Sequence, residues 1–286
     1  MRASLLPSSP EDVADACKPV RWTDMNAMLP REHGAYSQMV LPLATSLIVS
    51  HGAAPSLMIA IAVICGFLAH EPLLVLLGGR GVRAKQVAGA RAAIWFSGTA
   101  MAAIAAGSAA FTRAAPTVRW SFLLPLVPAS WVAASLFASC EKRASAEIAV
   151  ALAFAFTSVP MCLAAGLSAA EAFSVGIVFG SVFVTGVLCV RAIVLAKRGG
   201  GRPTASRETR LLLVAVAAVT VIGLGLGVSS ATLHWTTLLA VTPGLVAAVT
   251  LATRRSPPPL RTVGWSLALT SATAALILIG PARHLS

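Results

Sequence analysis

The sequence predicts an all-α protein, a polytopic bundle of about nine transmembrane helices. Of its 286 residues, 57% are apolar and 11% are charged, whereas soluble domains average about 45–50% apolar and about 25% charged residues. A soluble chain of this length would need more ionisable residues to cover its surface, so the surplus apolar residues must face a bilayer. They also occur in stretches of roughly 17–25 residues, the length that crosses about 30 Å of hydrocarbon.

Nine apolar stretches follow one another from Gly34 onward, with short polar or basic segments between them. We place them at residues 34–51, 55–77, 92–111, 120–139, 145–166, 171–195, 210–230, 233–252 and 263–280. The turn between the seventh and the eighth is short, so these two helices are expected to form a tight hairpin.

The chain is expected to contain two parts. Residues 1–33 are predicted to be a polar cytoplasmic segment, and they hold no apolar run long enough for a cleavable signal peptide. Residues 34–286 are predicted to form a single transmembrane helical domain, because no segment between the spans is long enough to build a soluble core.

The basic residues predict the orientation of the bundle. With the N-terminus in the cytoplasm, 19 of the 22 Lys and Arg residues fall on the cytoplasmic side, and only Arg113, Arg119 and Arg283 fall outside. Basic residues in short loops are retained in the cytoplasm, so we expect the N-terminus inside and the C-terminus outside. The same rule explains the net charge of +12, and no nucleic-acid partner is expected. The loops around Arg80 and Arg198 are candidates for contact with anionic headgroups.

Metal and cofactor chemistry has little support in the residue types. The five cysteines form neither a CxxC pair nor a cluster with histidine, and no Asp occurs after Asp24. Zinc and disulfide frameworks need such cysteine patterns, and a hard cation such as Mg²⁺ needs several oxygen ligands. We expect no metal and no cofactor.

The candidate site consists of polar and charged residues that lie within or next to the apolar stretches. A charge near the bilayer centre costs roughly 2.5–3.5 kcal/mol, so such residues are the most informative about function. They occur at the start of the first span, near the end of the second, at the start of the fifth and near the end of the sixth. All four places fall at the cytoplasmic face, which predicts one polar pocket there. Its candidate ligand-binding residues are Arg31, His33, His70, Glu71, Arg80, Glu147 and Arg191.

Glu71 is the deepest carboxylate of this set. The following Pro72 cannot donate its amide, so the helix is expected to bend there and direct His70 or Glu71 into the bundle. Arg191 is the partner that we expect for Glu71, because a guanidinium grips a carboxylate at two points. Both Arg191 and Glu147 have an alternative to a place in the pocket. The guanidinium of Arg191 can reach water at the membrane interface, and Glu147 can stabilise the first turn of the fifth helix.

Two stretches carry a resemblance to a known family. They are Pro30-Arg31-Glu32-His33-Gly34-Ala35-Tyr36, and Ala69-His70-Glu71-Pro72-Leu73 running on to Gly78-Gly79-Arg80-Gly81. This pattern resembles the YwiC-like family of bacterial integral membrane proteins. The resemblance implies a multi-pass protein of the bacterial inner membrane and names no reaction.

A looser resemblance is architectural. Nine helices with polar residues after the second and the sixth are similar to the UbiA family of membrane prenyltransferases, which place Asp-rich motifs there to hold Mg²⁺ and a prenyl diphosphate. This sequence has His70, Glu71 and Arg80 in the first place and Arg191 in the second. One Glu without Asp cannot replace two metal clusters, so a shared scaffold would favour direct cationic contact with an anionic ligand.

Three functions follow as hypotheses. The first is a cytoplasm-facing pocket that binds an anionic small molecule or lipid, as in a transporter. The second is a membrane-embedded transferase on a UbiA-like scaffold, with His33, His70 or Glu71 handling a proton. The third is a structural or assembly component of the membrane. The sequence leaves open whether the protein is an enzyme.

Overall fold

A computed structural model describes residues 29, 33–137, 144–197, 203–254, 256 and 258–282 of the chain. The predicted N-terminal segment therefore lies outside the described residues apart from Leu29 and His33, and its separation from the transmembrane domain stays a prediction.

The described residues are almost entirely helical, and they contain no strand. The elements are α2 (His33–Val49), α3 (Ala54–Leu77), α4 (Val82–Arg113), the 3₁₀ helix η2 (Pro116–Phe122), α5 (Leu123–Phe137), α6 (Ala144–Phe156), α7 (Ser158–Ala164), α8 (Ala169–Lys197), α9 (Pro203–Ser229), α10 (Trp235–Thr253) and α11 (Leu260–Ala282).

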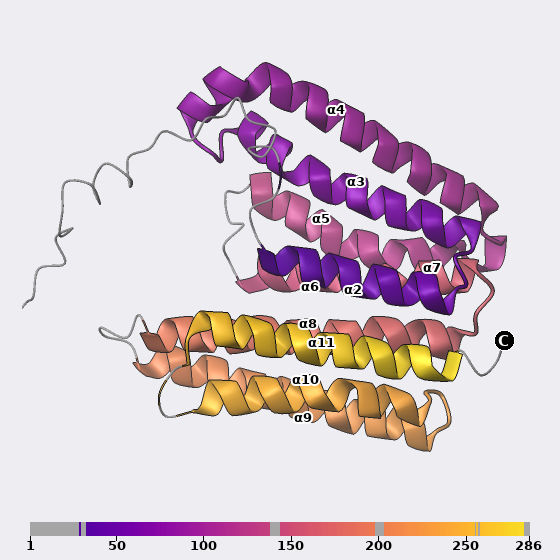
Figure 1. The fold of residues 1–286 in the computed structure, drawn as a ribbon, viewed down its shortest axis with the longest axis vertical. Coiled ribbons are helices and arrows are strands. Elements are labelled where there is room, and N and C mark those ends of the chain that lie inside the picture. Colours follow the sequence, from indigo (N-terminus) through magenta and orange to yellow (C-terminus); the bar gives the residue numbers. More distant parts are fainter. Residues whose placement is uncertain are drawn as a thin grey trace, which may run out of the picture.

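This element order confirms the predicted helical bundle. Among the described residues, seven segments are long and apolar enough to cross a membrane, with α6 and α7 together forming one of them. The shorter α2 and α5 lie beside them and run between the same two ends (Figure 1). Each of the nine predicted spans thus corresponds to a helical pass, and α9 and α10 form the expected hairpin. The chain is a multi-pass membrane protein.

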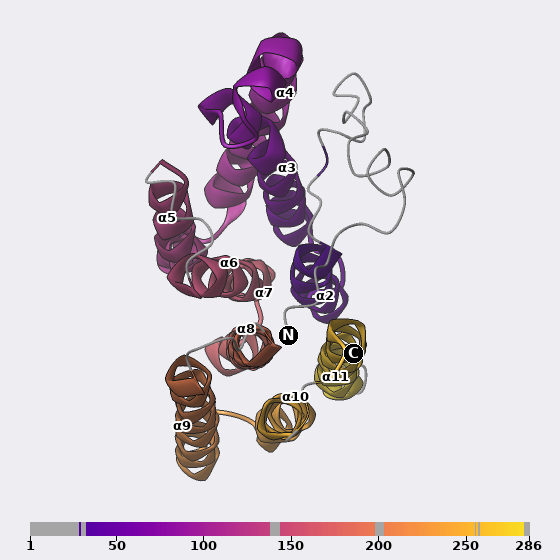
Figure 2. The same cartoon turned by 90° about the vertical axis from the view of Figure 1, so that its left-hand side faces the viewer.

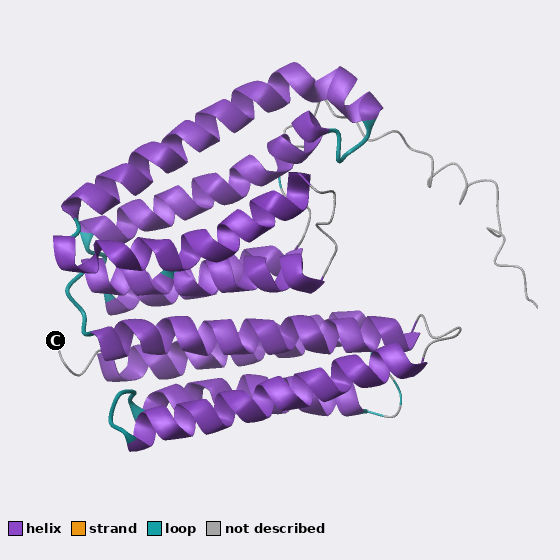
Figure 3. Cartoon of the chain, turned by 180° about the vertical axis from the view of Figure 1, so that it is seen from behind, coloured by secondary structure: helices purple, strands orange, loops and turns teal. Residues whose placement is uncertain are grey.

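The helices lie side by side and reverse direction at each turn (Figures 1 and 3). One end of the bundle holds the ends of α3, α5, α8 and α10 and the starts of α4, α6, α9 and α11. We call this the basic end, because every described Lys and Arg except Arg113 and Arg119 lies toward it. The other end, which carries η2, is called the opposite end. The positive-inside rule predicts that the basic end faces the cytoplasm.

Helix α8 lies at the centre of the main hydrophobic core. Its Val178, Phe179 and Val182 are buried together with residues of α6, α7, α10 and α11. Small residues permit this close packing: a Cβ atom at Gly176 would lie 2.9 Å from a methyl group of Val159, and one at Gly244 would lie 2.9 Å from a methyl group of Val182. Helix α8 is therefore held tightly on several sides.

The hairpin of α3 and α4 is attached much more loosely. These two helices pack against each other along their lengths, and α3 reaches the rest of the bundle mainly through α2 and α7. Helix α4 does not form a packed pair with α5, and viewed along the helices the α3–α4 hairpin and α5 diverge from the rest of the bundle (Figure 2). This divergence leaves room for the cavity described next.

Candidate functional site

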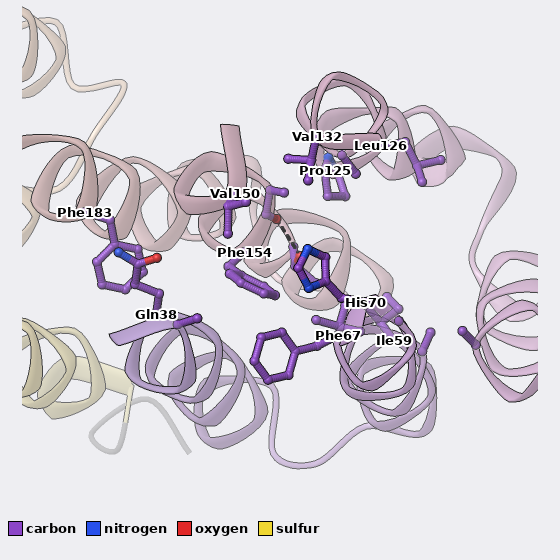
Figure 4. Close-up of a pocket in the computed structure, with 18 of the residues that line it drawn as sticks. Gln38, Ile59, Phe67, His70, Pro125, Leu126, Val132, Val150, Phe154 and Phe183 are labelled. Carbon is purple, nitrogen blue, oxygen red and sulfur yellow. Dashed lines mark hydrogen bonds between the residues drawn. The ribbon is translucent and has the colours of Figure 1, made fainter. Parts of the chain in front are cut away.

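A large cavity lies among the helices on the side of α8 that faces α2–α6. Its volume is about 1640 Å³, and its walls come from α2 to α8 and from α11. Most lining side chains are apolar, among them Ile59, Leu126, Val132 and Val150, which surround the space in Figure 4. The sequence predicted a polar pocket, whereas the structure has an apolar cavity with polar groups at particular places on its wall.

Aromatic rings form one part of this wall. The rings of Phe67 and Phe154 meet edge to face with centroids 5.8 Å apart, and Tyr36 meets Phe67 in the same way at 5.0 Å. Phe183 of α8 and Gln38 of α2 also line the cavity (Figure 4). Sequence reasoning missed the three phenylalanines, because apolar side chains within a transmembrane stretch carry no mark that separates a cavity wall from a lipid-facing surface.

His70 and Glu71 come from the last two turns of α3. Helix α3 continues through Pro72 to Leu77, although the ring of Pro72 leaves the carbonyl of Leu68 without its helical donor. The side chain of His70 lines the cavity, as do Phe67 and Phe154 (Figure 4). The side chain of Glu71 is buried, with 1% exposed.

A glycine turn brings Arg80 back to Glu71. Gly78 ends α3 in the left-handed conformation, with φ of 81°, and the amide of Gly79 donates to the carbonyl of Leu74 at 2.8 Å. Glycine adopts this conformation without the steric cost of a Cβ atom. Gly81 has φ of 95° and directs the chain into α4. The Gly78–Gly81 turn therefore folds Arg80 onto the helix that it has just left.

The resulting ion pair has two hydrogen bonds. The Nε of Arg80 donates to Oε1 of Glu71 at 2.7 Å, and its Nη2 donates to Oε2 at 2.6 Å. The expectation that Arg191 pairs with Glu71 was therefore wrong. The reason is local: nine residues and a glycine turn place Arg80 opposite Glu71, so a partner on the distant α8 is not required.

Arg191 instead pairs with Glu147. Its Nη1 donates to Oε2 of Glu147 at 2.8 Å, which connects α8 to the first turn of α6, and both side chains are partly exposed. Glu147 lines the cavity, whereas Arg191 does not.

Four of the seven sequence-predicted site residues line the same cavity. These are His70, Glu71, Arg80 and Glu147. Arg31 lies outside the described residues, as does the side chain of His33. That the gathered residues bind a ligand stays a prediction.

The sequence analysis did not predict two features of the cavity. Arg119, which the sequence suggested only as an outer loop residue, lines the cavity at the opposite end. In addition, α6 and α7 are separate helices joined at Thr157, and both Thr157 and Pro160 lie on the wall. A proline in the middle of an apolar stretch is the sequence signal for such a break.

The described residues contain no group of three or more His, Cys, Asp or Glu side chains that could hold a metal ion. Whether the protein uses a metal or a cofactor stays open to test, and the gathered groups suit a different chemistry. A guanidinium, an imidazole and an amide beside apolar walls can hold an acidic headgroup and the hydrocarbon attached to it.

Comparison with known proteins supports the resemblance seen in the sequence. Residues 29–162 match the family model described as YwiC-like protein, a stretch that runs from the start of α2 into α7 and includes the Glu71–Arg80 pair. No curated protein and no solved structure matches the chain.

Proposed function

We propose that this multi-pass membrane protein, YwiC-like over residues 29–162, binds an anionic lipid-like molecule in its cavity and carries it between the two faces of the membrane. We further propose that the membrane is a bacterial inner membrane with the basic end in the cytoplasm. The excess of Lys and Arg at one end supports this orientation, and the YwiC-like match supports the bacterial setting.

The size of the apolar cavity is the observation that carries the proposal. At about 1640 Å³, it exceeds the roughly 300–1,000 Å³ of sites that hold a small molecule. Folded interiors are normally close-packed, so a space this large leaves many wall atoms without contacts. A hydrocarbon chain would restore them. Because α4 and α5 both line the space but do not pack together, a lipid can enter between them from the bilayer.

The charges on the wall support an acidic headgroup. His70 and Arg80 lie on the wall toward the basic end, and Gln38 lines it on α2. Arginine binds phosphate and carboxylate groups through a planar array of donors, and an imidazole or amide can complete the contact. Arg80 is held in place by Glu71, so a headgroup would meet a guanidinium that is already oriented.

Two observations favour a carrier over a transferase. The cavity is lined by Arg80 toward the basic end and by Arg119 toward the opposite end, and it passes the α6–α7 break at Thr157. Interrupted helices are a recurrent feature of transporter binding sites. Both oxygens of Glu71 already accept hydrogen bonds from Arg80, so this carboxylate is engaged in an ion pair and is not available to contact a substrate. A purely structural role gives no reason for so large a cavity.

Reconstitution into vesicles tests the function. The full chain would be placed in vesicles that contain fluorescent phosphatidylglycerol, and a membrane-impermeant quencher would report how fast the inner-leaflet lipid reaches the outside. We expect faster quenching than in protein-free vesicles, and a smaller effect with zwitterionic phosphatidylcholine. Mass spectrometry of the recovered lipids serves as the control for chemistry. Unchanged quenching would contradict the carrier, and a lipid of altered mass would favour the transferase.

A further inference from the structure

The opposite end of the cavity is organised around Arg119. This residue lies in η2, the short 3₁₀ helix between α4 and α5, and its side chain lines the cavity with part of its surface exposed. The neighbouring Arg113 at the end of α4 is exposed and does not line the cavity; its Nη1 contacts the sulfur of Met58. Two arginines therefore occupy the same end of the bundle, and only one faces the site.

The guanidinium of Arg119 is fixed by groups that do not neutralise it. Its Nε donates to the carbonyl of Ala114 at 3.1 Å, and its Nη2 donates to the carbonyl of Thr112 at 3.2 Å. The ring of Phe111 lies beneath it, with 5.3 Å between the guanidinium carbon and the ring centroid. These contacts orient the group toward the cavity, and all of them are with dipoles or a ring.

Arg119 differs in this respect from the other arginines at the site. Arg80 is paired with Glu71 and Arg191 with Glu147, whereas the part of the chain that the structure describes gives Arg119 no carboxylate partner. Glu171 of α8, a carboxylate at the same end, is already engaged: its Oε2 accepts hydrogen bonds from the amide and the hydroxyl of Ser168. Arg119 therefore presents a positive charge to the cavity that no described carboxylate compensates.

We infer that Arg119 is a second anion-binding position, which holds the acidic headgroup of the ligand at the opposite end of the cavity. The hydroxyl of Ser108 and the indole of Trp120 line the same end and can donate to the same headgroup. The ligand class is an amphipath with a phosphate or similar acidic group. This inference rests on the proposed function, because it gives the transported headgroup one cationic position toward each membrane face.

Equilibrium binding to the full chain in detergent, with short-chain phosphatidylglycerol as the probe, tests the inference. We expect Arg119→Gln to bind about tenfold more weakly than the unaltered chain, the effect of one charge-assisted contact. Arg113→Gln is the matched control and should bind normally. Arg119→Lys should recover part of the loss, because it restores the charge, whereas a purely structural role for the guanidinium would give no such recovery. Thermal unfolding of each variant checks that the bundle is intact.

The outcomes separate the two proposals. The inference is overturned, and the proposed function stands, if the unaltered chain prefers phosphatidylglycerol to phosphatidylcholine and Arg119→Gln binds phosphatidylglycerol with the same affinity and preference. If the unaltered chain shows no preference, both are overturned. If binding depends on Arg119, inorganic phosphate is then added as a competitor. Displacement of the lipid would show that a free phosphate anion is a sufficient ligand, and failure to displace it would show that the whole lipid is required. Either result supports the position at Arg119.

Discussion

The two halves of this bundle differ in how they fill their interiors. Helices α8–α11 are closely packed, with glycines at the points where they approach one another and α6–α7, as at Gly176 and Gly244. Helices α2–α7 contribute most of the wall of a cavity of about 1640 Å³ and hold the buried Glu71, which is paired with the partly exposed Arg80. We call α2–α7 the hollow half and α8–α11 the packed half. The YwiC-like match at residues 29–162 covers most of the hollow half. The comparison indicates that one half provides rigidity and the other provides the site, and it predicts different effects of substitution in each.

The largest loss of stability is expected for Arg80→Gln in the hollow half. This change leaves the carboxylate of Glu71 buried without its partner, and removal of one member of a buried pair costs about 3–5 kcal/mol. Thermal unfolding of the purified protein in detergent measures the loss. The matched control is Arg83→Gln, which removes a charge from an exposed position in the first turn of α4. Equal stability of the two variants would contradict the account of the pair.

Removal of both partners sharpens this test. Because the cost arises from an unpaired buried charge, Glu71→Leu combined with Arg80→Met should recover most or all of the about 3–5 kcal/mol that Arg80→Gln loses. The same unfolding measurement applies. A double variant as unstable as the single one would mean that the shapes of these side chains, and not their charges, stabilise the end of α3.

A smaller loss is expected for Gly244→Val in the packed half. The new side chain would collide with Val182 of α8, and overpacking of a filled core costs about 1–3 kcal/mol. Gly223→Val is the matched control, because a Cβ atom at Gly223 of α9 has nothing within 4 Å. Thermal unfolding in detergent measures the difference, and equal stability of the two variants would contradict the close packing of this half.

The smallest effect is expected at the ion pair that joins the halves. Glu147 and Arg191 are 43% and 31% exposed, and exposed pairs contribute about 0–1 kcal/mol. Glu147→Gln should therefore shift the unfolding temperature only slightly, and the shift should shrink further in high salt. A loss as large as that of Arg80→Gln would show that this pair is an essential connection between α6 and α8.

Much of the fold could be predicted from the sequence, since a transmembrane helix needs a long apolar stretch and a boundary of polar or basic residues. The deep position of Glu71 was also predictable, because a charged group within a span must be buried or paired. Its partner was missed, since the decisive feature is the geometry of the Gly78–Gly81 turn and not the distribution of charge. Arg119 was assigned only to topology, because its approach to the cavity depends on how η2 packs.

The cavity itself could not be predicted. Its walls are built from Ala, Val, Phe and Gly residues that have the same composition as lipid-facing surfaces, so neither hydropathy nor periodicity separates the two. The cavity exists because the α3–α4 hairpin diverges from α5, and that divergence depends on the shapes of helices that are far apart in the sequence.

The central claim is that a lipid-like anion occupies the cavity of the hollow half, and native mass spectrometry of a cavity-filling variant tests it most directly. Gly66 of α3 lines the cavity, whereas Gly98 of α4 does not, and a Cβ atom at either has nothing within 4 Å. Gly66→Phe and Gly98→Phe thus add the same side chain inside and outside the cavity. We predict that Gly98→Phe retains phosphatidylglycerol like the unaltered chain and that Gly66→Phe loses it. Equal retention by the two variants would contradict the claim.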